Sequence, residues 1–211
     1  MPTLTTLRNH IETSVDALSR EYQRTQGLFL TEDDLKCALY HKLYTINTFS
    51  SPETTLDEHI SSIRIHSEVS WFDENGRLTI KPDITILEPS HLSILRGLNG
   101  RRRLPSKQFQ TDGGAILLEL KFVRGKSGVT HKTLQSIKKD LQKARTLLDR
   151  HSAMTDHNAN GIFCFVIVFA KTNHGNDLMQ PLIRQYEHSP GLKIIYKSGN
   201  VEFPHARRNV V

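Results

Sequence analysis

Three charged residues stand where the sequence would otherwise build a buried sheet. Glu119 and Lys121 interrupt the apolar run ILLELKFV at 116–123, and Asp83 follows Pro82 in the strand-like segment LTIKPDITIL. Charged side chains are costly to bury unless they are paired or bind a ligand, so this pattern indicates a site rather than plain core. Two carboxylates and one ammonium group are the side chains that suit metal-assisted hydrolysis of a phosphodiester.

Strand periodicity predicts that these residues converge. Alternate residues share one face of a strand, and neighbouring strands lie about 4.8 Å apart. The even positions of 116–123 are apolar and the odd positions carry Glu119 and Lys121, while Asp83 lies on the polar face of its own segment. We therefore expect Asp83 and Glu119 on one side of a sheet, where a cation between them would relieve their repulsion. All-oxygen ligation favours Mg²⁺ or Mn²⁺.

Other periodicities predict the elements that position these strands. Helical spacing of apolar residues indicates an N-terminal helix and a second helix after Thr31, a good N-cap with Asp34 three residues later. Alternating segments predict a hairpin of two strands over 62–87, and the strand at 116–123 follows. The last four predicted elements are a helix, a strand, a helix and a strand, at 133–150, 161–170, 176–186 and 192–197. This order predicts an α/β fold with a mixed sheet flanked by helices.

The composition is that of one globular domain. The chain has 211 residues, of which 37% are hydrophobic and 24% are charged, which is enough for a full core. We expect a helical extension at 1–26, a core at 28–200 and a basic insertion loop at 88–114. No apolar run of about 18 residues predicts a membrane span, so we expect a cytoplasmic protein with no membrane partner. Neither a disulfide between Cys37 and Cys164 nor a zinc site is expected.

At its charged residues the sequence resembles a known family. The dipeptide PD and the tripeptide ELK at 119–121 are similar to the signature of the PD-(D/E)XK nuclease superfamily. The predicted elements from about 28 to 170 also resemble the restriction-endonuclease-like αβββαβ core of that family. The resemblance implies that Asp83 and Glu119 ligate a metal ion and that Lys121 positions or activates a water molecule. It also implies a further acidic residue from the first core helix.

Two acidic residues compete for that further position. On a helical wheel of about 100° per residue, Glu32 shares the face of Leu35 and Leu39, whereas the next two acids point away. Acids in the first turn of a helix are also common for capping alone. Glu68 is the alternative, because it is predicted on the polar face of the strand beside that of Asp83. We predict Glu32 as the third metal ligand and keep Glu68 as a competing catalytic residue.

Basic residues near these strands suggest a surface for nucleic acid. The connection at 88–114 exceeds about 15 residues, and such connections are usually functional or disordered. A basic insertion between two catalytic strands is well placed to contact a phosphate backbone, and the net charge of +6 permits such a partner. The candidate contacts are Arg96, Arg101, Arg102, Arg103 and Lys107 in the insertion, and Lys138, Gln142 and Arg145 on the following helix.

The sequence leaves two classes of function open. The first is a divalent-metal-dependent nuclease, with DNA expected over RNA and endonuclease action expected over exonuclease action; a homodimer would suit a double-strand cut. The alternative is a catalytically silent nuclease-fold module that binds nucleic acid or takes part in an assembly, because one intact signature does not exclude it. The sequence contains no Gly-rich phosphate loop and no nucleophile elbow, which disfavours unrelated phosphate-handling hydrolases.

Overall fold

A five-stranded mixed sheet forms the centre of the protein. The structure is a computed structural model that describes residues 2–72, 78–94, 104–105, 109–111, 113–154 and 161–200. The sheet has the order β12-β11-β10-β6-β3, and its strands are β3 (Ile65–Ser67), β6 (Ile84–Leu87), β10 (Ala115–Val123), β11 (Ile162–Ala170) and β12 (Leu192–Ser198). β10, β11 and β12 run parallel, whereas β6 is antiparallel to both β10 and β3.

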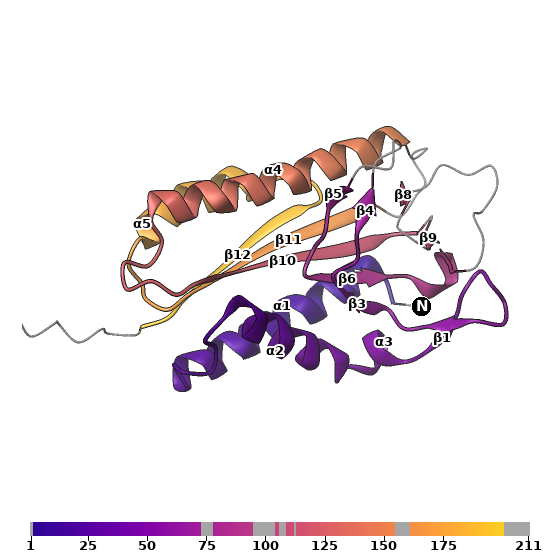
Figure 1. Cartoon of the computed structure of the whole chain (residues 1–211), viewed down its shortest axis with the longest axis horizontal. Coiled ribbons are helices and arrows are strands. Elements are labelled where there is room, and N and C mark those ends of the chain that lie inside the picture. Colours follow the sequence, from indigo (N-terminus) through magenta and orange to yellow (C-terminus); the bar gives the residue numbers. More distant parts are fainter. Residues whose placement is uncertain are drawn as a thin grey trace, which may run out of the picture.

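Helices cover both faces of this sheet (Figure 1). One face packs against α1 (Leu4–Arg24) and α2 (Glu32–Tyr44), and the other packs against α4 (His131–Met154) and α5 (Asn176–Tyr186). A short helix, α3 (Asn47–Ser50), follows α2. The predicted mixed α/β sheet with flanking helices and an N-terminal helix is therefore confirmed. The specific restriction-endonuclease-like core stays a prediction.

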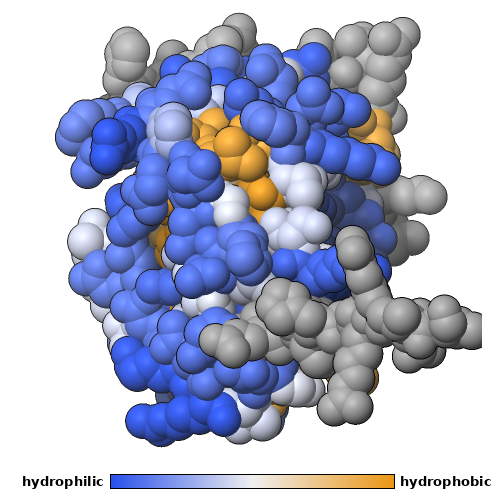
Figure 2. Space-filling model, turned by 90° about the vertical axis from the view of Figure 1, so that its left-hand side faces the viewer, coloured by the Kyte–Doolittle hydropathy of each residue, from blue (hydrophilic) through white to orange (hydrophobic). Residues whose placement is uncertain are grey.

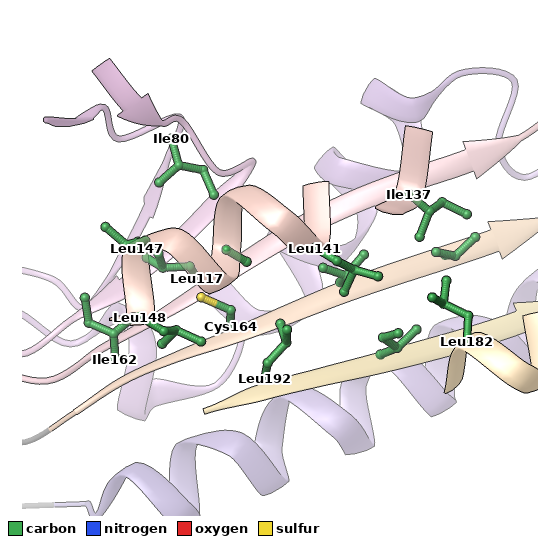
Figure 3. Close-up of a cluster of buried hydrophobic side chains, with 14 of the residues drawn as sticks. Ile80, Leu117, Ile137, Leu141, Leu147, Leu148, Ile162, Cys164, Leu182 and Leu192 are labelled. Atoms are coloured by element: carbon green, nitrogen blue, oxygen red, sulfur yellow. The ribbon is translucent and has the colours of Figure 1, made fainter. Parts of the chain in front are cut away.

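Two separate apolar clusters hold the layers together. Even-numbered residues of β10, such as Leu118, lie in the cluster under α1 and α2, and odd-numbered residues such as Leu117 lie in the cluster under α4 and α5. Figure 3 shows Leu117, Cys164 and Leu192, from three neighbouring strands, gathered beneath α4 with Leu141 of that helix. Each fully buried aliphatic side chain contributes about 1.5–3 kcal/mol relative to an exposed one. Glu119 and Lys121 are the odd positions of β10 that depart from this pattern.

The predicted start of α2 is confirmed by a capping box. The Thr31 hydroxyl accepts a hydrogen bond from the Asp34 N–H at 3.0 Å, and the Asp34 carboxylate accepts one from the Thr31 N–H at 2.9 Å. These two bonds satisfy backbone donors that a helix start would otherwise leave open. They also fix Glu32 as the first residue of α2, beside the sheet.

The predicted hairpin over 62–87 is bent, which corrects the expectation of two continuous strands. Its base is β3 with β6, and its upper part is a separate pair, β4 (Trp71–Phe72) with β5 (Leu78–Ile80). Ile65 and Ile84 lie in the cluster under α1 and α2, whereas Trp71 and Ile80 lie in the cluster under α4. The connection at 73–77, where the sequence DENG favours a turn between the two strands, lies outside the described residues.

Local backbone chemistry explains this bend. In the first strand Glu68 has φ 54°, a left-handed conformation that interrupts a strand. In the second strand Pro82 has no N–H group to donate to a ladder. The apolar side chains therefore change faces between the base and the upper part of the hairpin, and Asp83 lies directly at the bend.

The insertion at 88–114 is not wholly a loop, as far as the structure describes it. It contains a short 3₁₀ helix, η1 (Pro89–His91), and a small sheet of β7 (Leu92–Ser93), β9 (Gln110–Thr111) and β8 (Leu104–Pro105). A further pair, β1 (Glu53–Thr54) with β2 (Ser61–Ser62), precedes β3. The candidate contacts Arg96, Arg101, Arg102, Arg103 and Lys107 lie outside the described residues.

The surface at one end of the molecule is mainly polar. Figure 2 views the end that lies on the left of Figure 1, and it shows a hydrophilic surface with a small apolar area near its centre. An end of this composition is suited to solvent or a charged partner rather than to a broad apolar interface. In the part of the chain that the structure describes, no helix combines the length and the hydrophobicity that a membrane span requires.

Two glycines bring together the loops that lead into α4 and α5. Gly128 has φ 59° and Gly175 has φ 77°. A Cβ atom on Gly128 would lie 2.1 Å from the His174 carbonyl oxygen, and one on Gly175 would lie 2.0 Å from the Val129 carbonyl oxygen. The Val129 N–H also donates to the His174 carbonyl at 3.0 Å. The close approach of the two loops thus requires glycine at both positions.

We expect Gly175→Ala to lower the free energy of unfolding by roughly 2–4 kcal/mol. An L-residue in the left-handed region costs about 1–2 kcal/mol, and the added methyl group would overlap the Val129 carbonyl. Gly125→Ala is the matched control, because a Cβ atom there would have no neighbour within 4 Å, and its effect should stay within about 0.5 kcal/mol. Urea denaturation of both variants measures the difference, and equal effects would contradict this account.

Candidate active site

The site begins where β10 loses its antiparallel partner. β6 pairs with only the first four residues of β10, so the backbone N–H groups further along that edge need other acceptors. Two carboxylates supply them. The Leu120 N–H donates to Asp83 Oδ2 at 2.8 Å, and the Phe122 N–H donates to Glu32 Oε2 at 3.0 Å. One edge of β10 therefore brings together a residue that precedes β6 and the first residue of α2.

The strand register sets Glu119 opposite Asp83. Ile84 is paired with Leu118 in the antiparallel ladder, and one step outward from this pair lie Asp83 and Glu119. Glu119 is directed to the α4 side of the sheet together with Leu117. The predicted convergence of the two carboxylates thus follows from the pairing of β6 with β10, although regular pairing ends one residue earlier.

Burial and the repulsion between nearby carboxylates raise the pKa values of both carboxyl groups. Burial raises the pKa of Glu119 to about 7, and the nearby charges of Asp83 and Asp140 add to the rise. Burial also raises the pKa of Asp83, against the lowering effect of the Leu120 N–H, and the charge of Glu32 raises it further. A nearby positive charge would stabilise both ionised forms.

Lys121 supplies the central positive charge of the site. Its Nζ atom lies 3.4 Å from Asp140 Oδ2, 3.5 Å from Glu32 Oε1 and 3.7 Å from Glu119 Oε1. Burial disfavours the ammonium form, but these three carboxylates together outweigh it and raise the pKa of Lys121. The side chain is therefore an ammonium group at neutral pH, held between α2, β10 and α4.

Asp140 is the member of the site that sequence reasoning missed. Its side chain is only 8% exposed, and its Oδ1 atom lies 3.1 Å from Lys143 Nζ. Its Oδ2 atom has no hydrogen-bond partner among the described residues but lies 3.4 Å from Lys121 Nζ, so Lys121 and Lys143 together offset the charge of this carboxylate. The sequence did carry a signal: Asp140 lies three residues after Ile137 and four before Ala144, inside the apolar stripe of α4.

Glu68, the competing acid, belongs to a separate ion cluster on the surface. Its carboxylate lies 2.7 Å from Lys36 Nζ and 2.6 Å from Lys81 Nζ. Hydrogen bonds from these two ammonium groups lower the pKa of Glu68 to about 2, and the bond from Lys36 has the larger effect. The structure thus joins Glu32, and not Glu68, to the group around Lys121. A direct catalytic role for either acid stays a prediction.

The candidate nucleic-acid contacts on α4 lie away from the acidic site. On a wheel of about 100° per residue, Lys138, Gln142 and Arg145 lie about 140–200° from Asp140. Arg145 also pairs with Asp149, with 3.0 Å between Nε and Oδ1. These three residues are therefore placed to contact a partner on the outer face of α4, and their binding role stays a prediction.

Comparison with known proteins does not assign the chain to a family. No family model, no curated protein and no solved structure matches it. The part of the chain that the structure describes also holds no group of three or more His, Cys, Asp or Glu side chains arranged to bind a metal ion. Function must therefore be argued from the chemistry of the site itself.

Removal of the Glu119 charge should stabilise the metal-free protein above neutral pH. The unfolded chain releases this proton near pH 4.5 and the folded protein near pH 7, so the folded state holds more protons in that window. The free energy of unfolding therefore falls as the pH rises through the window. Since each pKa unit corresponds to about 1.4 kcal/mol, we expect Glu119→Gln to be more stable by roughly 3 kcal/mol at pH 8.

Urea denaturation in EDTA, repeated from pH 4 to pH 8, measures this effect. Glu119→Gln should flatten the decline of stability with pH. Glu21→Gln is the control, because Glu21 is an exposed partner of Lys42 and should leave the decline in place. If wild type and Glu119→Gln give parallel pH curves, burial does not perturb Glu119 as described.

Proposed function

We propose that the protein is a divalent-metal-dependent nuclease that hydrolyses phosphodiester bonds, with DNA as the expected substrate. The observation that supports this proposal is the proximity of Asp83 and Glu119 at the edge of β10, just beyond its pairing with β6. Lys121 lies two residues further along the same face of the strand. The resemblance of the PD and ELK motifs to the PD-(D/E)XK superfamily supports the same activity, as does the helix residue Glu32 beside Lys121.

The charges of the site fit a divalent cation. Asp83 and Glu119 both have raised pKa values because they are buried near other carboxylates, and a cation between them would relieve that repulsion. These two residues would hold the ion, with Glu32 as the third ligand. Magnesium keeps several water molecules and often takes only one or two carboxylates from the protein. When bound, Mg²⁺ or Mn²⁺ lowers the pKa of a coordinated water and offsets the negative charge of the phosphate.

Residues of the chain supply the remaining requirements. Lys121 presents an ammonium group that would bind an oxygen of the reacting phosphate and stabilise charge as it develops. Asp140 and Glu32 hold that group from two sides, at 3.4 and 3.5 Å. Asp140 is therefore a positioning residue rather than a catalytic one. The N–H groups of Leu120 and Phe122 orient two of the carboxylates.

The alternative function is a nuclease-fold module that binds nucleic acid without cleaving it. The observation that favours it is that the described residues contain no preformed group of three metal ligands. Binding of DNA without divalent-dependent cleavage would select this alternative over the nuclease.

Divalent-dependent cleavage should depend on the two central carboxylates. Purified protein incubated with circular and linear DNA should cleave in Mg²⁺ or Mn²⁺ and not in EDTA, and cleavage of circles would identify an endonuclease. Asp83→Asn and Glu119→Gln each keep the size of the side chain but remove a charge, so each should reduce the rate on the order of 100-fold or more. Asp16→Asn, a surface residue paired with Lys197, is the control. Wild-type rates in both site variants would exclude the proposed metal site.

Lys121→Met should separate the chemical step from binding. Methionine keeps much of the length of the side chain but removes the ammonium group, which we expect to act at the reacting phosphate. Single-turnover cleavage in Mg²⁺ should therefore slow by about 10²-fold or more, while affinity for DNA in Ca²⁺ changes little. Thermal unfolding checks that the variant is folded. An unchanged cleavage rate would remove Lys121 from the mechanism.

A further inference from the structure

Two lysines from different elements converge on one carboxylate beside the acidic site. Lys36 lies on α2, and Lys81 lies between β5 and β6. Each ammonium group takes a different oxygen of Glu68: Lys36 Nζ lies 2.7 Å from Oε1, and Lys81 Nζ lies 2.6 Å from Oε2. The two non-bridging oxygens of a phosphodiester could bind in the same way, with one ammonium group donating to each oxygen.

This cluster is linked to the acidic site by three connections. The Glu68 N–H donates to the Asp83 carbonyl oxygen at 3.1 Å. Lys81 lies two residues before Asp83, and Lys36 lies four residues after Glu32, one turn along α2. The two lysines therefore border the carboxylates at which a scissile phosphate would bind, at a position suited to a neighbouring phosphate of the same chain.

The Glu68 side chain is accessible to solvent, as is that of Lys81, whereas that of Lys36 is largely buried. The Glu68 side chain is 46% exposed, whereas that of Lys36 is 16% exposed and is held also by Asp33 at 2.9 Å. Glu68 has φ 54°, in a region that asparagine and glycine tolerate better than glutamate does. Backbone preference therefore does not explain a glutamate at this position, and its contact with the two lysines does.

We infer that Lys36 and Lys81 form a phosphate-binding subsite in which the Glu68 carboxylate occupies the place of a phosphate until a phosphodiester chain displaces it. The identity of the chain, a nucleic acid, rests on the proposed function. In the free protein Glu68 bridges and orients the two ammonium groups and offsets part of their charge. When a polyanion binds, the half-exposed carboxylate turns outward to solvent and a phosphate takes its place. Glu68 is then a competitor of the ligand and not a metal ligand.

Substitutions of the acidic residue and of the two lysines should change the affinity for DNA in opposite directions. Glu68→Gln removes the competing charge, so affinity for DNA should rise about three- to fivefold at low salt. Glu68→Asn, which suits the left-handed backbone, should give the same direction and guards against a folding defect in the first variant. Lys36→Gln with Lys81→Gln should weaken binding and reduce the slope of log affinity against log salt by about 1–2, because fewer counterions are released.

The experiment is a fluorescence anisotropy titration of a labelled duplex DNA, in EDTA, over a range of salt concentrations. The matched controls are Glu21→Gln, which frees one lysine elsewhere, and Lys42→Gln with Lys193→Gln, which removes two lysines that each pair with one carboxylate. The controls should bind like the wild type. The inference is overturned if Glu68→Gln binds no more tightly than the wild type, or if the double lysine variant keeps the wild-type salt slope.

A parallel cleavage assay in Mg²⁺ separates this inference from the proposed function. If the wild type binds DNA but cleaves nothing, while Glu68→Gln still binds more tightly, the phosphate-binding subsite is supported and the proposed nuclease function is wrong. If Glu68→Gln loses cleavage with unchanged affinity, Glu68 acts as a metal ligand and the inference is overturned. Absence of any DNA binding by the wild type would also overturn it.

Discussion

The need of buried backbone N–H groups for an acceptor shapes the whole site. β10 has nine residues, but β6 pairs with it through only four, because the chain bends at the residues just before β6. Side-chain carboxylates of Asp83 and Glu32 take over where the ladder stops. A structural requirement of the sheet thus places acidic groups at one edge, and the same requirement orients them.

The accumulation of carboxylates explains why three layers meet at one lysine. Glu32, Glu119 and Asp140 come from α2, β10 and α4, and each lies within 4 Å of Lys121 Nζ. Without that ammonium group, α4 would place the buried Asp140 beside Glu119 of β10, close to the carboxylates bound at the edge of that strand. Such an arrangement is unfavourable for stability in the absence of a ligand, and sites of this kind are often kept for function at the expense of stability.

Sequence patterns predicted the parts of the site that depend on local periodicity. The alternation along 116–123 placed Glu119 and Lys121 on one face, and the capping signal at Thr31 placed Glu32 at the start of α2. The bend was not predictable in the same way, because alternation continues through Glu68 and Pro82 even though the backbone turns there. The change of face by Trp71 and Ile80 depends on packing under α4, which is a long-range contact.

Asp140 shows a second limit of sequence reasoning. Its position inside the stripe of α4 could be read from the spacing, but its role depends on which strand the helix covers and on the charge that this strand presents. The outer residues Lys138, Gln142 and Arg145 were easier to notice because they are polar residues on an exposed helix. Whether a polar residue faces a site or solvent is decided by the rotation of the helix against the sheet.

The carboxylate-capped edge of β10 has a consequence for spectroscopy. The amide protons of Leu120 and Phe122 are hydrogen-bonded to ionisable side chains rather than to the backbone of a neighbouring strand. Their chemical shifts and exchange with deuterium therefore depend on the charge and orientation of Asp83 and Glu32, whereas amides in the middle of β11 depend on the sheet alone. These two backbone groups are natural reporters, readable without any label at the site, of protons or cations arriving at the carboxylates.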